Sequence, residues 1–168
     1  IASCLVGSEM CIRDRAGTAG RPSVILVLGD SLSAEYGLAR GTGWVALLEK
    51  QLAQDKLAAT VVNASVSGET TSGGRSRLAA LLAQHKPSHV VIELGGNDAL
   101  RGLPLKNTEE NLAWMTQAAQ KAGAKVLLVG MQVPPNYGTD YANKFAGLFT
   151  TVAPVSYTHL RAHETRGN

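Results

Sequence analysis

The chain has 168 residues, 45% of them hydrophobic, with 16 lysines and arginines against 13 aspartates and glutamates and a formal net charge of +3. This length and composition suit one globular domain with a sizeable core. The basic residues are scattered and not interleaved with aromatic residues, so nucleic acid is not expected as a partner. No apolar run approaches the roughly 20 residues that span a bilayer, so no integral membrane segment is expected.

Predicted strands and helices alternate along the chain. Apolar runs rich in β-branched residues predict buried strands over residues 23–28, 59–63, 89–94 and 124–129. Amphipathic patterns predict helices over residues 44–55, 75–84, 107–122 and 140–152. This order predicts an α/β protein with a parallel sheet and right-handed crossovers. We expect a flavodoxin-like three-layer α/β/α sandwich with the strand order 2-1-3-4.

The two ends of the chain are compatible with a single inverted nucleotide repeat. With suitable codons, the reverse complement of a sequence encoding residues 1–15 encodes residues 154–168. Natural termini have no reason to show this relation, so both segments are interpreted as adapter-derived tails, and residues 16–153 are predicted to be the native domain. Both cysteines lie in the first tail and therefore say nothing about disulfides. Because the second tail begins where a fifth strand is due, we expect the fifth strand and the last helix to be missing.

Polar groups follow three of the predicted strands. Ser31 comes directly after the first strand in the run Gly29-Asp30-Ser31, Gly68 follows the second strand, and Asn97 follows the third. The carboxyl ends of parallel strands meet at one edge of the sheet, which is where open α/β sheets bind their ligands. The glycine of the first run is expected to let the backbone turn sharply after the strand. A lone Gly-Asp-Ser is also typical of a turn or a helix cap, so the interpretation depends on the other two loops.

Together these groups have the composition of an acyl-transfer site. A serine hydroxyl can attack a carbonyl carbon when hydrogen-bond donors stand ready for the charge that forms on the carbonyl oxygen. The backbone amides of Ser31 and Gly68 and the side-chain amide of Asn97 are candidate donors. Each donor of this kind can lower the barrier by about 3–4 kcal/mol. The sequence therefore predicts a serine nucleophile at the sheet edge.

Three sequence blocks resemble those of the SGNH (GDSL) hydrolases: Gly29-Asp30-Ser31-Leu32-Ser33, Gly68, and Gly95-Gly96-Asn97-Asp98. The similarity is closest to the bacterial arylesterase, lysophospholipase and acyl-CoA thioesterase I group, and it extends over nearly all of residues 23–153. It implies that Ser31 is the nucleophile and that Gly68 and Asn97 belong to the oxyanion hole. It also implies that Asp30 and Asp98 support the site through hydrogen bonds and that no metal or other cofactor is needed.

The resemblance also implies a function. It predicts a serine esterase that hydrolyses carboxylic esters or thioesters through an acyl-serine intermediate, with small-molecule esters, thioesters or lysophospholipids as substrates. It further implies that the intact parent is periplasmic or secreted. We also expect a monomer. Met131 and Tyr137 follow the fourth strand and are candidates for lining an acyl pocket.

The general base of this family is absent from the sequence. Members carry Asp-x-x-His near the carboxyl end, but no aspartate in this chain has histidine three residues later. His85 and His89 flank the start of the third strand, at the opposite end of the sheet from Ser31, and the other two histidines lie in the second tail. Without a base a serine stays protonated and weakly nucleophilic. We therefore expect this chain to be a nearly inactive fragment.

Two alternatives remain open from the sequence. A carbohydrate or peptidoglycan O-acetylesterase of the same fold would carry the same three blocks. A non-catalytic flavodoxin-like binding module, such as a receiver or a flavin binder, would share the fold without the chemistry. A receiver needs an acidic cluster and a lysine after a late strand, and only Asp30 and Asp98 lie near the predicted edge.

Overall fold

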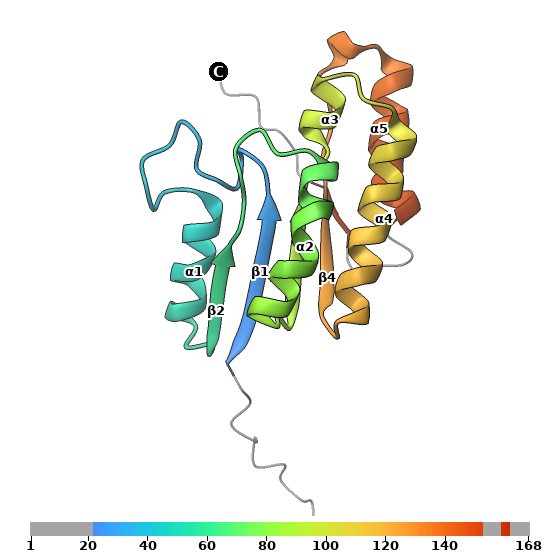
Figure 1. Cartoon of the computed structure of the whole chain (residues 1–168). Helices are drawn as coiled ribbons and strands as arrows, with labels where there is room; N and C mark the ends of the chain where they lie inside the picture. The colour runs from blue at the N-terminus through green and yellow to red at the C-terminus, as the bar shows by residue number, and fades with distance from the viewer. Residues whose placement is uncertain (1–21, 153–158, 162–168) are drawn as a thin grey trace, which may run out of the picture.

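The sheet of the protein is parallel throughout. The computed structural model describes residues 22–152 and 159–161 (Figure 1). Its strands lie in the order β2-β1-β3-β4-β5, and every neighbouring pair is parallel. The strands are β1 (Ser23–Gly29), β2 (Ala59–Asn63), β3 (His89–Glu93), β4 (Lys125–Gly130) and β5 (His159–Arg161). The first four strands have the predicted order 2-1-3-4.

The expectation that a fifth strand is missing was wrong. The three residues of β5 pair with β4 in the register Leu128↔His159, Val129↔Leu160 and Gly130↔Arg161. An edge strand presents a row of unpaired N–H and C=O groups, which an extended segment can satisfy whatever its side chains are. β5 falls within residues 154–168, whose adapter origin stays a prediction. The expectation of a missing last helix concerns residues that lie outside the described ranges.

Helices cover both faces of the sheet, which confirms the three-layer sandwich. They are α1 (Trp44–Gln54), α2 (Thr71–His85), α3 (Gly96–Leu100), α4 (Leu105–Lys121) and α5 (Thr139–Val152), with a 3-10 turn η1 (Pro135–Tyr137) before α5. One core cluster joins α2, α4 and α5 to the sheet and includes Leu28, Leu78, Ile92, Leu112 and Phe149. A smaller cluster of Val27, Val45 and Val91 joins α1 to the other face. None of the helices in the described ranges has both the length and the apolar composition to cross a membrane.

The start of α2 differs from the prediction. The helix begins at Thr71 rather than at residue 75, because the side chain of Thr70 caps it by accepting a hydrogen bond from the Gly73 amide at 3.3 Å. The sequence predicts a loop here because two glycines lie in the first turn of the helix. A Cβ at Gly74 would lie 2.4 Å from a methyl carbon of Leu94, so the missing side chain lets the helix approach the sheet closely. Packing therefore outweighs the low helix propensity of glycine here.

Candidate active site

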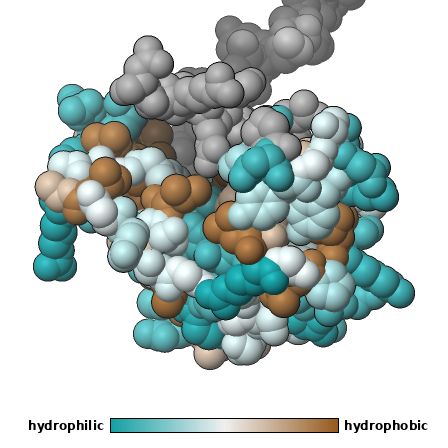
Figure 2. All heavy atoms as spheres, turned by 90° about the horizontal axis from the view of Figure 1, so that it is seen from above, coloured by the Kyte–Doolittle hydropathy of each residue, from teal (hydrophilic) through white to brown (hydrophobic). Residues whose placement is uncertain are grey.

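The predicted site residues lie on loops at the carboxyl edge of the sheet, toward which β1 points in Figure 1. Ser31 is half-buried in the turn after β1, Gly68 lies in the loop before α2, and Asn97 lies in the first turn of α3. Viewed from above, this edge shows apolar patches among polar side chains (Figure 2). Leu32 and Leu100 contribute exposed apolar surface there. The structure thus brings the three loops to a common edge.

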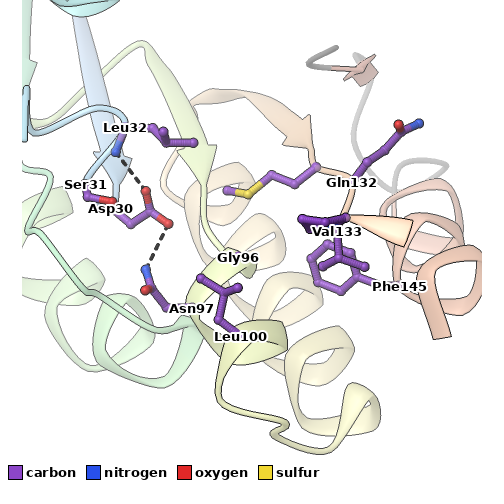
Figure 3. A pocket seen from close by; sticks show the side chains of 11 residues that line it. Asp30, Ser31, Leu32, Gly96, Asn97, Leu100, Gln132, Val133 and Phe145 are labelled. Carbon is purple, nitrogen blue, oxygen red and sulfur yellow. Dashed lines mark hydrogen bonds between the residues drawn. The ribbon is translucent and has the colours of Figure 1, made fainter. Parts of the chain in front are cut away.

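A pocket of about 190 Å³ opens beside Ser31 (Figure 3). Its polar side is formed by Asp30, Ser31 and Asn97. Its apolar side is lined by Leu32, Leu100, Met131, Val133 and Phe145, with Gly96, Gln132 and Pro134 completing the wall. Met131 therefore lines the pocket as the sequence suggested, whereas Tyr137 does not belong to its lining.

Asp30 holds two segments in place, because each of its carboxylate oxygens accepts a hydrogen bond. Oδ1 accepts a hydrogen bond from the Leu32 amide at 3.0 Å, which closes the turn over Ser31. Oδ2 accepts from Nδ2 of Asn97, also at 3.0 Å (Figure 3). Burial raises the pKa of Asp30 above its ordinary value, and the hydrogen bonds from Leu32 and Asn97 oppose that rise. This carboxyl group therefore couples the turn that carries Ser31 to Asn97.

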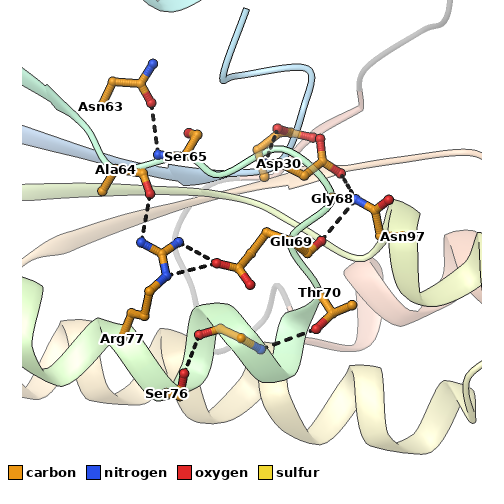
Figure 4. A network of polar contacts seen from close by, with 12 residues as sticks. Asp30, Asn63, Ala64, Ser65, Gly68, Glu69, Thr70, Ser76, Arg77 and Asn97 are labelled. Carbon is orange, nitrogen blue, oxygen red and sulfur yellow. Dashed lines mark hydrogen bonds and ion pairs between the residues drawn. The ribbon is translucent and has the colours of Figure 1, made fainter. Parts of the chain in front are cut away.

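The side-chain nitrogen of Asn97 uses both of its hydrogens. Besides Asp30, its Nδ2 donates to the carbonyl oxygen of Glu69 at 3.0 Å (Figure 4). An amide nitrogen carries two hydrogens, so both are used. These bonds hold Asn97 between the loops that follow β1 and β2. Donation to an oxyanion would require one of the two bonds to be exchanged for the new acceptor.

Two backbone amides at the site are free. Within the described residues, neither the Ser31 N–H nor the Gly68 N–H donates a hydrogen bond. Gly68 has φ of +77°, a left-handed conformation that favours glycine, and its carbonyl oxygen accepts a hydrogen bond from Nη2 of Arg101 at 2.9 Å. Most backbone amides are paired in folded proteins, so free ones at a pocket mark candidate anion donors.

A partly exposed ion pair braces the loop that carries Gly68. Nη2 of Arg77 lies 2.6 Å from Oε2 of Glu69, and Nη1 of Arg77 donates to the carbonyl oxygen of Ala64 at 3.1 Å (Figure 4). Glu69 in turn supplies the carbonyl oxygen that holds Asn97. The sequence did not predict this ion pair. Glu69 and Arg77 are eight residues apart, one before α2 and one within it, and this spacing is not typical of an ion pair.

Asp98 ties the third loop to the start of α2. The side chain is 2% exposed, and it accepts hydrogen bonds from the amide of Thr71 at 2.9 Å and from its hydroxyl at 2.6 Å. The hydroxyl of Thr108 lies at 3.5 Å. These hydrogen bonds fix the position of the residue that follows Asn97, and the supporting role of Asp98 in the site stays a prediction.

Replacement of Thr71 by valine is expected to lower the free energy of unfolding by about 2 kcal/mol, because it removes a hydrogen bond to a buried carboxylate. Thr71→Ser keeps the hydroxyl and is the matched control. Urea unfolding measures both variants. A loss below about 0.5 kcal/mol, the usual range of a neutral surface change, would contradict the bracing role.

Glu93 was not predicted as a site residue from the sequence. It is 4% exposed and lies at the end of β3. Its Oε2 accepts hydrogen bonds from the hydroxyl of Ser33 at 2.7 Å and from the Asp30 amide at 3.3 Å. Burial raises the pKa of Glu93 to about 7, a rise that Asp30 assists and the Ser33 hydroxyl opposes. The available signal was a lone carboxylate ending an otherwise apolar strand.

The histidines lie away from Ser31. Nδ1 of His89 contacts the hydroxyls of Ser23 at 3.2 Å and Ser88 at 3.0 Å, at the amino ends of β1 and β3. His85 is in the last turn of α2. Both imidazoles are therefore at the end of the sheet opposite the pocket, which confirms the sequence-based placement.

A parallel sandwich that places a serine and an asparagine in the lining of one largely apolar pocket, at the carboxyl edge of the sheet, has the arrangement of a serine acyl hydrolase. Residues 27–155 match the family described as GDSL-like lipase/acylhydrolase. The chain belongs to this family, which confirms the resemblance found in the sequence.

Individual relatives are similar over most of the chain. Esterase TesA of Pseudomonas aeruginosa is 54% identical over 136 residues, which are 81% of this chain and 68% of the relative. Thioesterase 1/protease 1/lysophospholipase L1 of Escherichia coli K12 is 43% identical over 80% of this chain and 64% of its own length. The chain thus spans about two thirds of the length of these curated relatives.

Solved structures share the fold. A crystal structure of TesA superposes with a TM-score of 0.77 at 54% identity, covering 79% of this chain and 73% of that one. The psychrotrophic esterase EstA from Pseudoalteromonas, in a structure inhibited by monoethylphosphonate, superposes with a TM-score of 0.79 at 42% identity, covering 83% of this chain and 77% of that one.

Proposed function

We propose that this site hydrolyses carboxylic esters or thioesters through an acyl intermediate on Ser31. The observation that carries the proposal is the position of Ser31 in the pocket lining beside Asn97. Among the described residues, the amides of Ser31 and of Gly68, which lies at the same sheet edge, donate no hydrogen bond. Family membership supports the reaction class. The names of the relatives, esterase and thioesterase, support an alcohol or a thiol as the leaving group.

In the proposed reaction, Ser31 Oγ forms a bond to the carbonyl carbon of the ester and gives up its proton to a water molecule, from which the leaving group later takes a proton. The carbonyl electron pair moves onto oxygen, and the amides of Ser31, Gly68 and Asn97 donate to this oxyanion. Collapse of the intermediate expels an alcohol or thiol, which takes a proton, and leaves the acyl group on Ser31. Water then attacks the acyl-serine by the same route and releases the carboxylic acid.

The apolar side of the pocket supports an acyl site. Leu100, Met131, Val133 and Phe145 offer no charge to the substrate, so the acyl chain of an ester, thioester or lysophospholipid is assigned to this wall. Comparing p-nitrophenyl esters of increasing chain length with acyl-CoA, lysophospholipid and acetyl-xylan tests the assignment. Preference for acetyl-xylan would favour the O-acetylesterase alternative.

The direct test of the function compares p-nitrophenyl butyrate hydrolysis by this chain and by Ser31→Ala. With no Asp-x-x-His in the sequence, we expect the chain as given to turn over slowly, because an oxyanion hole and substrate binding alone retain about 10³–10⁴-fold of catalysis over water. Robust turnover that is lost in Ser31→Ala would contradict the missing base, and a chain joined to an Asp-x-x-His segment that still shows no Ser31-dependent hydrolysis would overturn the proposal.

Asn97→Ala is expected to slow acylation by about 10²–10³-fold, the usual cost of losing one oxyanion donor. The release of p-nitrophenol in the first turnover measures this step. Asn107→Ala, an exposed asparagine on α4, is the matched control. A change smaller than about fivefold, or about 1 kcal/mol, would remove Asn97 from the oxyanion hole.

We further propose that the protein acts as a monomer and that its parent works in the periplasm or outside the cell. The second statement rests on the family resemblance of the sequence. Light scattering at several concentrations tests the first. Fractionation of cells that express the parent gene tests the second, and retention in the cytoplasm would contradict it.

A further inference from the structure

Glu93 lies directly beneath the turn that carries Ser31. It ends β3 and is in register with Gly29, the last residue of β1. The side chain is almost fully buried, although nothing in the proposed reaction uses it. Burial of a carboxyl group is costly unless its hydrogen bonds compensate, so its contacts indicate what the group does here.

The hydrogen-bond directions around Glu93 follow from donor chemistry. Nε1 of Trp44, at the start of α1, lies 3.1 Å from the hydroxyl oxygen of Ser33. An indole N–H only donates, so Ser33 accepts this bond and its own hydrogen points to Oε2 of Glu93 at 2.7 Å. The Asp30 amide donates to the same oxygen at 3.3 Å. Oε2 is therefore the acceptor in both contacts.

Gly29 makes this approach possible. A Cβ at this position would lie 2.6 Å from Oγ of Ser33 and 2.7 Å from Oε2 of Glu93. Its φ does not lie in the left-handed region, so the sequence-based reason for this glycine, a sharp turn, was incomplete. The missing side chain instead leaves room for the carboxylate and the hydroxyl to meet behind the turn.

We propose that Glu93 is a positioning residue of the nucleophile turn, because its Oε2 accepts hydrogen bonds from Asp30 and Ser33, the groups that flank Ser31. The role of Ser31 as nucleophile is taken from the proposed function. The contacts of Glu93 stand independently of it.

The positioning does not require the negative charge. Oε1 of Glu93 has no hydrogen-bond partner among the described residues, so a bound proton resides on Oε1 while Oε2 keeps accepting. The pKa of about 7 means that both forms are populated near neutrality, and Asp30 is the charged group in the described structure that acts on it. A glutamine can therefore replace Glu93 with its carbonyl oxygen at the Oε2 position, whereas a leucine cannot.

The test compares Glu93→Gln, Glu93→Leu and Ser33→Ala in the full chain, with Glu49→Leu on the exposed side of α1 as the control. One readout is hydrogen exchange of the Asp30 amide together with the ¹H–¹⁵N signal of the Trp44 indole. The other is the rate of Ser31 phosphonylation by a fluorophosphonate, per folded protein. We expect Glu93→Gln and Glu49→Leu to match the unsubstituted chain in both exchange and labelling rates. We expect Glu93→Leu to exchange the Asp30 amide at least about tenfold faster and to label at least about tenfold slower.

Each outcome decides the proposal. If Glu93→Leu exchanges and labels at the rates of the unsubstituted chain, the positioning role is overturned. If Glu93→Gln is as impaired as Glu93→Leu, the claim that positioning does not need the negative charge is overturned. If Glu93→Leu does not fold, Ser33→Ala decides, with slower labelling and a shifted Trp44 signal expected. If the parent chain itself does not label, the proposed function fails, and the exchange measurements still test the positioning role.

Discussion

Adding the family's Asp-x-x-His segment, with the strand and helix around it, to the carboxyl end of this chain is expected to raise p-nitrophenyl butyrate turnover at least about a thousandfold. The site offers a hydroxyl and amide donors, but His85 and His89 lie at the far end of the sheet. Within the described residues no group forms a hydrogen bond with the Ser31 hydroxyl, so we expect general-base catalysis to be the missing step.

The controls for this fusion follow from the mechanism. Ser31→Ala in the fused protein should return turnover to the level of the alanine variant of the shorter chain. Replacing the added histidine alone should remove most of the gain, since members of a triad act as a unit. If the shorter chain already turns over as fast as the fusion, another group acts as the base and the account of the missing base fails.

Replacing Glu93 by glutamine is expected to change the pH dependence of stability by about 3 kcal/mol. The folded-state pKa is raised from 4.5 to about 7, so between these values the folded state binds more protons than the unfolded state. The free energy of unfolding of the parent chain should therefore fall as the pH rises through this window. The stabilising contribution is complete below pH 4.5 and lost above about pH 7.

Urea unfolding from about pH 4 to pH 8 measures this effect as the difference between the parent chain and Glu93→Gln. The pKa of Asp30 is raised in the same direction, and subtraction removes most of its contribution. Glu49→Gln, an exposed glutamate on α1, should give a curve parallel to that of the parent. A parallel curve for Glu93→Gln as well would show that the carboxyl group is not buried as described.

Most of the fold follows from the alternation of apolar runs and amphipathic segments. The run through Leu26, Val27 and Leu28 is fully buried, as expected of a central parallel strand. Secondary-structure propensity gave the wrong prediction where tertiary packing determines the local structure. Gly74 alone predicts a loop, and only its contact with Leu94 explains a helix at this position. β5 forms by pairing with the edge strand β4, which a side-chain pattern does not predict.

The site was predictable where its residues belong to loop motifs at strand ends. Topology alone brings Asp30 and Asn97 into contact, so their adjacency could be expected from the strand order. Glu93 was missed because its partners, Asp30 and Ser33, come from a different strand-end loop sixty or more residues away. Sequence spacing carries no record of such a contact.

The most direct test of the central claim is the mass of the full chain after prolonged incubation with a fluorophosphonate, followed by peptide mapping. A serine beside free amide donors should be phosphonylated ahead of the chain's other serines, even without a base. The account predicts one adduct, on Ser31, that is lost in Ser31→Ala and slowed in Asn97→Ala. An adduct spread over several serines, or none on Ser31, would contradict it.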